Sequence, residues 1–400
     1  MGISTPHAVL SPQVQQLHDA VIALRQTLHQ WPELGFQEER TSALVAEHLS
    51  TLGLQVTTGL ARTGVLGVLH GAGEGKTVLL RADMDGLPID EASGAPYTSR
   101  NPGVMHACGH DGHTAILLTV AKVLAQQRQD FAGTVKFAFQ PAEELPPGGA
   151  KGMIAEGVLE NPRVDAVFGL HLWNGLPIGK IGVDAGPIMA SVDRFDVVIK
   201  GVGSHGAYPH TGVDPIVIGS HVISALQTVV SRETPPLAPV VVTVGRFQGG
   251  TAFNVIPSQA ELSGTVRTID AKVRQDMPSR LERIVRGVTS AMRADYEFRY
   301  EFGYPVTVNH PEMAQFARRV AAEIVGEANV VTAGMTMGAE DMSYFLEAVP
   351  GCYVRLGSGN PEQGLIHPHH SALFNFDEAA LPIGVELLTR LTLAALRDMV

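Results

Sequence analysis

The chain has 400 residues, which is too long for one ordinary hydrophobic core and predicts two or three structural units. Hydrophobic residues make up 45% of the chain and charged residues 17%, a balance that excludes a disordered protein. The formal net charge of −11 argues against broad binding to nucleic-acid backbones, although local Arg residues or a metal could still attract a small anionic substrate.

Helical and strand-like segments alternate through the first half of the chain. Ser11 followed by Pro12 is typical of a helix start, and apolar residues at helical spacing predict one helix that ends before Pro32. A second helix is predicted at 38–52, and strands are predicted at 64–70, 77–85, 134–144 and 165–174. This alternation predicts an α/β unit with a mixed, largely parallel sheet flanked by helices.

The pattern changes near Gly186. The segments that follow are a strand at 194–201, a helix at 214–232, strands at 239–247 and 260–268, a helix at 270–293 and a strand at 296–300. This β-α-β-β-α-β order is typical of a compact α+β sandwich, which we expect to be an inserted domain at 187–302. A helix after Pro311, a strand at 352–357 and a final helix from about Asp377 would complete the first sheet. Residues 1–186 and 303–400 are therefore predicted to form one discontinuous domain.

The sequence also carries weak evidence on location. Two cysteines, Cys108 and Cys352, do not make a disulfide scaffold. No cationic segment followed by an apolar run opens the chain, so we expect no secretory signal peptide. No apolar stretch is long enough to span a bilayer. We therefore expect a cytoplasmic protein.

Residues of metal-ligand type gather at the ends of the predicted strands. They are Asp83 and Asp85, Glu143 and Glu144, and His171, joined by Cys108 and His110 in a Gly-containing loop and by His367, His369 and His370 near the end of the chain. Singly, each has an ordinary explanation as a solvated strand end, a buried thiol, a helix-capping imidazole or a core histidine. Their repeated occurrence at strand ends indicates instead a site for divalent transition-metal ions.

The adjacent pair Glu143 and Glu144 has the two functions that metal-assisted hydrolysis requires. Adjacent residues on a strand point to opposite faces, but at a strand end the chain can twist so that both approach one site. One carboxylate would then bind metal, and the other would act as general base toward the attacking water.

Characteristic motifs extend this pattern over nearly the whole chain. In order they are LHQWPELGFQEERTSALVAEHL, RADMDGLPI, HACGHDGHTA, QPAEE, GLHLWN, KGVGSHGAYPH, GGTAFNVIP, GTVRT, GAEDMSYFL and HHSALFNFDE. With these motifs the sequence resembles the M20 metallopeptidase superfamily. The resemblance is to its amidohydrolase branch, which includes hippurate hydrolases, N-acyl-amino-acid amidohydrolases and plant auxin-conjugate hydrolases.

The resemblance implies a role for each matching residue. The implied ligands of two divalent metal ions (Zn, Mn, Co or Ni) are Cys108, His110, Glu144, His171 and His370, with Cys108 bridging the two ions. Glu143 would be the general base, Asp85 would orient a ligand, and His205 would polarise the scissile carbonyl. In relatives this last histidine comes from the partner subunit, which implies a homodimer or higher homo-oligomer formed through the inserted domain.

Two further residues are implied to contact substrate. Asn254 and Arg267 match positions that would hold the substrate carboxylate, although an ion pair on a strand surface is an equally good explanation of Arg267. The implied reaction is cleavage of the amide bond of N-acetyl or N-benzoyl L-amino acids to a carboxylic acid and a free amino acid. No nucleic-acid or membrane partner is expected.

Several alternatives stay open at this stage. The same scaffold could act as a dipeptidase or carboxypeptidase, or Cys108 could be the nucleophile of a cysteine hydrolase with His110 or His113 as base. A non-catalytic protein that binds amino-acid conjugates is the least favoured alternative, because the base and all five candidate ligands are present.

The sequence also departs from the family pattern. The segment Leu145-Pro146-Pro147 replaces a glycine run and leaves substrate preference open, while Ala372 stands where relatives often have Pro. Asp83 occupies a position that is a metal-binding His in other branches. Either of the neighbours His369 and His370 could be the ligand, and we choose His370 from its distance to Phe374.

Overall fold

The computed structural model describes residues 8–398. The first seven residues, on which the expectation of no signal peptide partly rests, lie outside the described residues. The chain divides into two compact units. The first comprises the described parts of Met1–Ile188 and Asp341–Val400 together with Val308–Gly334, and the second comprises Met189–Thr307 and Met335–Glu340. Among the described residues, no helix has both the length and the apolar character that crossing a bilayer requires.

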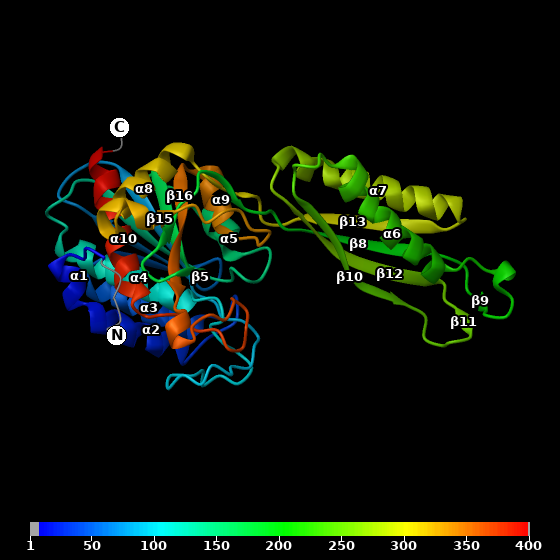
Figure 1. The fold of residues 1–400 in the computed structure, drawn as a ribbon, viewed down its shortest axis with the longest axis horizontal. Coiled ribbons are helices and arrows are strands. Elements are labelled where there is room, and N and C mark those ends of the chain that lie inside the picture. The colour runs from blue at the N-terminus through cyan, green and yellow to red at the C-terminus, as the bar shows by residue number, and fades with distance from the viewer. Residues whose placement is uncertain (1–7, 399–400) are drawn as a thin grey trace. The chain divides into compact units, whose positions relative to one another are not determined.

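The first unit is built on a mixed eight-stranded sheet with the order β1-β2-β4-β3-β5-β16-β6-β15 (Figure 1). The strands are β1 (Gln55–Leu60), β2 (Gly64–His70), β3 (Thr77–Asp83), β4 (Thr134–Gln140), β5 (Ala166–Pro177), β16 (Gly351–Gly359), β6 (Ile181–Gly182) and β15 (Val330–Val331). The central strands β4, β3, β5 and β16 are mutually parallel, whereas β1, β2 and β6 pair antiparallel. The predicted fold class is confirmed, and the returning segment β16 joins the sheet beside β5 as expected.

Ten helical segments accompany this sheet within the described residues. They are α1 (Pro12–Gln16), α2 (His18–His29), α3 (Glu39–Thr51), α4 (His110–Gln126), α5 (Gly149–Ala155), α8 (Pro311–Val325), α9 (Met342–Ala348) and α10 (Ala380–Asp398), with the short 3-10 turns η2 (Glu327–Asn329) and η3 (Pro361–Gln363). Ser11 caps α1 as predicted. The prediction of a single helix before Pro32 is wrong, because Leu17 leaves helical geometry and separates α1 from α2. The N–H of Leu17 donates to the Val14 carbonyl at the end of α1.

Burial explains which strands the sequence revealed. Every residue of β3 and β4 is buried, as expected for central strands covered on both faces, and their apolar runs were recognisable. Strand β1 was not predicted, because it lies at the sheet edge with mostly exposed polar side chains. The predicted strands 77–85 and 134–144 end earlier, at Asp83 and Gln140, so the acidic residues beyond them belong to loops.

The second unit is an α+β sandwich with the predicted β-α-β-β-α-β order. Its elements are β8 (Asp193–Lys200), β9 (Ser204–His205), η1 (Pro209–Thr211), α6 (Pro215–Glu233), β10 (Val240–Gly249), β11 (Val255–Ile256), β12 (Gln259–Thr268), α7 (Ala271–Ala291) and β13 (Asp295–Phe302). The antiparallel sheet has the order β10-β12-β8-β13, and β9 pairs with β11. Figure 1 shows α6 and α7 on one face of this sheet. Strand β7 (Gly186–Met189) pairs with β14 (Thr307–Asn309).

Alternation of side chains builds the core of the second unit. Phe195, Val197 and Ile199 of β8 are buried, while the residues between them are more exposed. They pack in one cluster with Ile218 and Val222 of α6, so the helices cover the apolar face of the sheet. The other face of the sheet carries Arg194, Asp196 and Lys200 of β8 together with Val198.

Candidate metal centre and active site

The five predicted metal ligands converge in the first unit. Cys108, His110 and His171 each place one ligand atom within 4.8 Å of the other two, and Cys108, Glu144 and His370 form a second such group. Cys108 belongs to both groups, as a bridging ligand would. The first three residues are buried, whereas His370 is exposed. The structure therefore brings together, from four separate segments, the five side chains that the sequence selected.

The loop before α4 sets the directions of Cys108 and His110. Gly109 between them has a φ of 89°, in the left-handed region that favours glycine. This turn places the thiol and the imidazole on the same side, and the imidazole begins the helix. The buried Nε2 of His110 has no hydrogen-bond partner among the described residues, and Asp83 Oδ2 lies 3.7 Å from it. A buried nitrogen without a hydrogen bond, beside a carboxylate, suits a cation.

A second turn brings the two glutamates to the same place. Ala142 has a φ of 52°, and its N–H donates to Oε1 of the buried Glu38 at 2.8 Å. After this turn, the main-chain N–H groups of Glu143 and Glu144 donate to the two carboxylate oxygens of Asp85, each at 3.0 Å. Glu143, Glu144 and His110 form a third group of ligand atoms within 4.8 Å of one another.

Asp85 also touches the imidazole side of the site. His110 Nδ1 lies 3.0 Å from the main-chain oxygen of Asp85 and 3.3 Å from its carboxylate. An Nδ1–H bonded in this way leaves Nε2 as the atom available to a metal. Asp85 thus fixes both the glutamate turn and the ring of His110.

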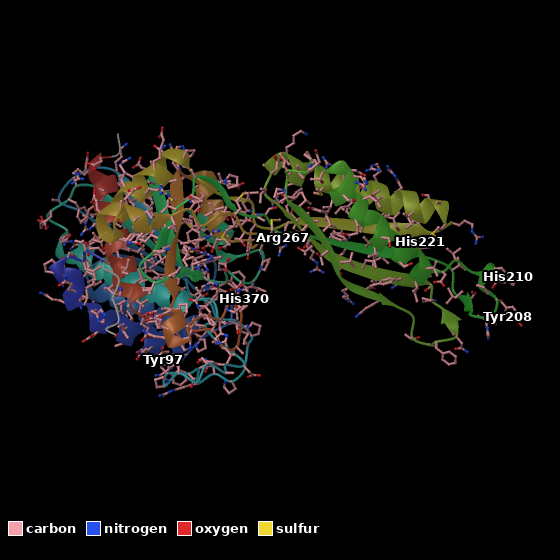
Figure 2. All side chains as sticks on the ribbon, viewed as in Figure 1. Tyr97, Tyr208, His210, His221, Arg267 and His370 are labelled. Carbon is pink, nitrogen blue, oxygen red and sulfur yellow. The ribbon has the colours of Figure 1, made fainter. Side chains whose placement is uncertain are left out.

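The choice between the two neighbouring histidines has a geometric basis. His370 Nε2 lies 2.8 Å from Glu144 Oε1, whereas His369 Nε2 contacts the main-chain oxygen of Leu172 at 2.9 Å. His370 has a φ of 66° and its N–H donates to Ala107, so the backbone turns at this residue. Only His370 of the pair belongs to a candidate ligand group among the described residues, and Figure 2 labels it at the edge of the first unit.

The electrostatics of the site match a bound cation better than a nucleophilic thiol. Burial raises the pKa of Cys108 well above its usual value, and the nearby Glu144 and Glu143 carboxylates raise it further. A cysteine nucleophile requires the opposite shift, so the site does not favour a cysteine hydrolase. Burial lowers the pKa of His110, but the carboxylates of Asp83 and Asp85 outweigh it and raise that pKa to about 10. Thiolate, imidazole and carboxylate donors together fit a transition metal.

A buried ion-pair cluster beside the site was missed at the sequence level. Asp111 directly follows His110 in the sequence. Arg25 Nε and His29 Nδ1 both lie 2.7 Å from Asp111 Oδ2. Burial would raise the pKa of Asp111, but Arg25 and His29 more than offset this and hold the pKa far below its usual range. Neither Arg25 nor His29 carries a local signal, because on α2 they resemble ordinary helix-surface residues.

The three predicted site residues of the second unit lie at two different ends of its sheet. His205 and Asn254 are exposed neighbours, because β9 pairs with β11 and Gly206 N–H donates to the Asn254 carbonyl at 2.8 Å. Arg267 follows Val266, which pairs with Asp193 at the start of β8. His205 in β9 instead follows the end of β8 at Lys200. The length of β8 therefore separates Arg267 from His205 and Asn254 by about 25 Å. Figure 2 shows Arg267 at the opposite end of this unit from Tyr208 and His210.

Comparisons with known proteins identify the family of this chain. The sequence profile of Peptidase family M20/M25/M40 matches residues 79–394. The N-acyl-L-amino acid amidohydrolase of Geobacillus stearothermophilus is 49% identical over 75% of this chain and 80% of its own. Thermostable carboxypeptidase 2 of Saccharolobus solfataricus is 40% identical over 94% of this chain and 95% of its own. A solved structure, the YXEP protein of Bacillus subtilis, is similar with a TM-score of 0.84 and 36% identity, covering 96% of this chain and 100% of that chain.

That solved structure is described as a dinuclear metal-binding peptidase of the M20 family. The family profile spans most of the chain, and the carboxypeptidase relative covers 94% of it. The expected resemblance is therefore confirmed. The chain belongs to peptidase family M20/M25/M40, and it is a hydrolase of amide bonds whose first unit contains residue groups able to hold a metal ion.

Proposed function

We propose that this chain is a di-metal amidohydrolase that cleaves N-acetyl or N-benzoyl L-amino acids to a carboxylic acid and a free amino acid. The observation that carries the proposal is the pair of ligand groups sharing Cys108, with the Glu143 carboxylate close to His110 and Glu144. The similarity to an N-acyl-L-amino acid amidohydrolase supports the acylated substrate class.

The proposed ligands of two divalent ions are Cys108, His110, Glu144, His171 and His370. The donor types suit Zn, Mn, Co or Ni. When bound, such ions lower the pKa of water and polarise a carbonyl group. Cys108 would bridge the two positions, since it is the one residue common to both of its groups.

Glu143 is the proposed general base and proton carrier. It would accept a proton from the attacking water and then donate this proton to the departing amine. Its main-chain N–H is held by Asp85, so the carboxylate starts from a fixed backbone position. Asp85 is therefore proposed to orient the site rather than to react.

The second unit is proposed to act across a homodimer or higher homo-oligomer. About 25 Å of sheet separates Arg267 from His205 and Asn254, so one copy cannot bring all three to one small substrate. His205 would serve the partner's site by polarising the scissile carbonyl, with Asn254 beside it, and Arg267 is proposed to hold a substrate carboxylate. The open edge strand β10 and the exposed Phe253 and Leu237 offer surface for self-association.

The domain roles follow from these assignments. Residues 1–186 and 303–400 would form the catalytic domain, and 187–302 a lid and dimerisation domain. The two cysteines of the chain are both buried and free, which agrees with the proposed cytoplasmic location.

A carboxypeptidase or dipeptidase activity is the second candidate, because a thermostable carboxypeptidase is 40% identical over nearly the whole chain. The test is to remove metal with a chelator, restore Zn, Mn, Co or Ni, and compare turnover of benzoyl-glycine, acetyl-methionine and unblocked dipeptides. Metal-dependent hydrolysis of the two acylated compounds supports the proposal. Preference for unblocked dipeptides, or full activity after chelation, would overturn it.

A further inference from the structure

We propose that His113 is a positioning residue that fixes the orientation of His171 and thereby raises the affinity of the metal that His171 would hold. The inference rests on the metal centre proposed above and adds a role to a histidine outside its ligand set. His113 lies in the first turn of α4 and is 2% exposed.

Both ring nitrogens of His113 are already engaged. Nδ1 lies 2.6 Å from Asp83 Oδ1, and Nε2 lies 2.9 Å from the main-chain nitrogen of Leu172. A main-chain N–H can only donate, so Nε2 accepts this bond and Nδ1 carries the proton that it donates to Asp83. Although Asp83, His110 and His113 are close enough to surround a cation, His113 has no lone pair left to bind one.

Asp83 is a rigid support for this ring. Its Oδ2 accepts from Arg81 Nη1 at 2.7 Å, and Arg81 Nη2 donates to Asp341 at 2.9 Å. The main-chain oxygen of Asp83 accepts from the Thr114 hydroxyl at 2.9 Å. All these side chains are buried, so water does not compete for their hydrogen bonds.

The other side of His113 leads directly to the candidate ligand. Leu172 follows His171 on β5, and its carbonyl oxygen lies 2.6 Å from His171 Nδ1 and 2.9 Å from His369 Nε2. A proton on His171 Nδ1 leaves Nε2 as its ligand atom, and this atom lies 3.5 Å from Cys108 Sγ. His113 thus holds the main-chain N–H of Leu172, and the rings of His171 and His369 hold its carbonyl oxygen.

The rings of His113 and His171 also touch, with centroids 4.7 Å apart at 69°. A truncation to Ala would leave a cavity at this contact, so it would not isolate the hydrogen bond. Substitution of His113 by Asn or by Gln distinguishes its two hydrogen bonds, the one to Asp83 and the one from Leu172 N–H. In His113→Asn the amide group can reach Asp83 but offers no acceptor to Leu172, whereas in His113→Gln the longer amide can accept from Leu172 N–H.

The experiment is a titration of the metal-free full-length chain with Co²⁺, followed by the absorption of the bound cobalt. We expect two binding steps in the wild type, and His113→Asn should weaken one of them by about 10–100-fold. His113→Gln should stay close to the wild type. In a His171→Ala background, His113→Asn should have no further effect, because the residue through which it acts is gone.

Unchanged binding in His113→Asn, or an equal loss with and without His171, overturns the inference while leaving the metal centre in place. Weakening of both steps together with a lower unfolding midpoint of the metal-free variant also overturns it, since that result indicates general damage to the fold. A wild-type chain that binds fewer than two cobalt ions would instead overturn the proposed function itself.

Discussion

His370 Nε2 lies 2.8 Å from Glu144 Oε1, although the two residues come from distant parts of the chain. The hydrogen bond with this carboxylate raises the pKa of His370. An imidazole and a carboxylate so close together are either an ion pair or two ligands of one cation, and Cys108 beside them favours the second.

Replacement of the two neighbouring histidines distinguishes these alternatives. Loss of a residue that only hydrogen-bonds to a metal ligand lowers metal affinity by about 10–100-fold. His370→Ala should lower it by more than this, because a ligand itself is removed. His369→Ala removes a hydrogen bond with the Leu172 carbonyl and ring contacts with His171, Trp173 and Phe374, but no candidate ligand atom. The loss of metal affinity in this variant should therefore stay within that range. Metal content after dialysis against a buffered metal series measures both variants. Equal losses in the two variants would contradict the assignment of His370.

Glu143→Gln tests the general base. The substitution keeps the shape of the side chain and the main-chain bond to Asp85, but it removes the group that accepts the proton. We expect metal content to stay at the wild-type value while kcat falls by about 10²–10⁴-fold. Glu144→Gln is the matched control, because it should lose metal as well as activity. A near-normal kcat in Glu143→Gln would remove this residue from the reaction.

Mixing two inactive variants tests whether His205 acts on the partner's site. A heterodimer of His205→Ala and Glu143→Gln chains would contain one site with both its own Glu143 and the partner's His205. Random exchange of subunits should therefore restore up to about a quarter of wild-type activity. Each variant alone, carried through the same dissociation and mixing steps, is the control. Absence of recovery despite demonstrated heterodimers would show that His205 acts within its own chain.

The sequence predicted the site better than its surroundings because ligand types repeat at strand ends. Parallel strands bring their carboxyl ends to one edge of a sheet, so the acidic residues after β3 and β4 lie near one another. His171 was expected at a strand end but lies within β5, just past Gly169, where the pairing of β5 with β3 stops. The turn at Ala142 and the ion pair of Arg25 with Asp111 depend on contacts between distant segments. No local periodicity reports such contacts, which is why they came only from the structure.

The ion pair of Arg25 with Asp111 should be important for stability. Both side chains are fully buried, so removal of the cation leaves a carboxylate without its main partner. Arg25→Met should lower the free energy of unfolding by about 3–5 kcal/mol. Urea unfolding followed by the fluorescence of Trp31 and Trp173, both in the first unit, measures the loss.

Arg397→Met is the control for Arg25→Met, because Arg397 pairs with Asp398 on the surface of the same unit. Loss of that exposed pair should change the unfolding free energy far less than loss of the buried pair, because solvent screens it. If the two variants were equally stable, the buried pair would contribute no more than a surface pair.

Glu38 is a buried carboxyl group that hydrogen-bonds to the turn at Ala142, directly before Glu143 and Glu144. Its carboxylate accepts hydrogen bonds from the N–H of Ala142 and from the Thr63 hydroxyl. Burial raises the pKa of Glu38 above its ordinary value of 4.5; the hydrogen bonds partly oppose this shift, and the nearby Asp85 carboxylate adds to it. The folded chain therefore holds this proton to a higher pH than the unfolded chain does.

Glu38→Gln should consequently stabilise the protein in a pH-dependent way. Because the folded pKa exceeds the unfolded one, the contribution of Glu38 to wild-type stability falls as pH rises from about 4.5 through the folded pKa. Gln keeps an oxygen for the Ala142 N–H and an amide for Thr63 but does not titrate. The unfolding free energy of the variant minus that of the wild type should therefore increase with pH and then level off. Urea unfolding of both metal-free chains between pH 4 and 8 measures this difference, in which the titration of all other groups cancels. A difference that decreases with rising pH would mean that the Glu38 carboxylate is better stabilised as an anion in the folded protein than in water.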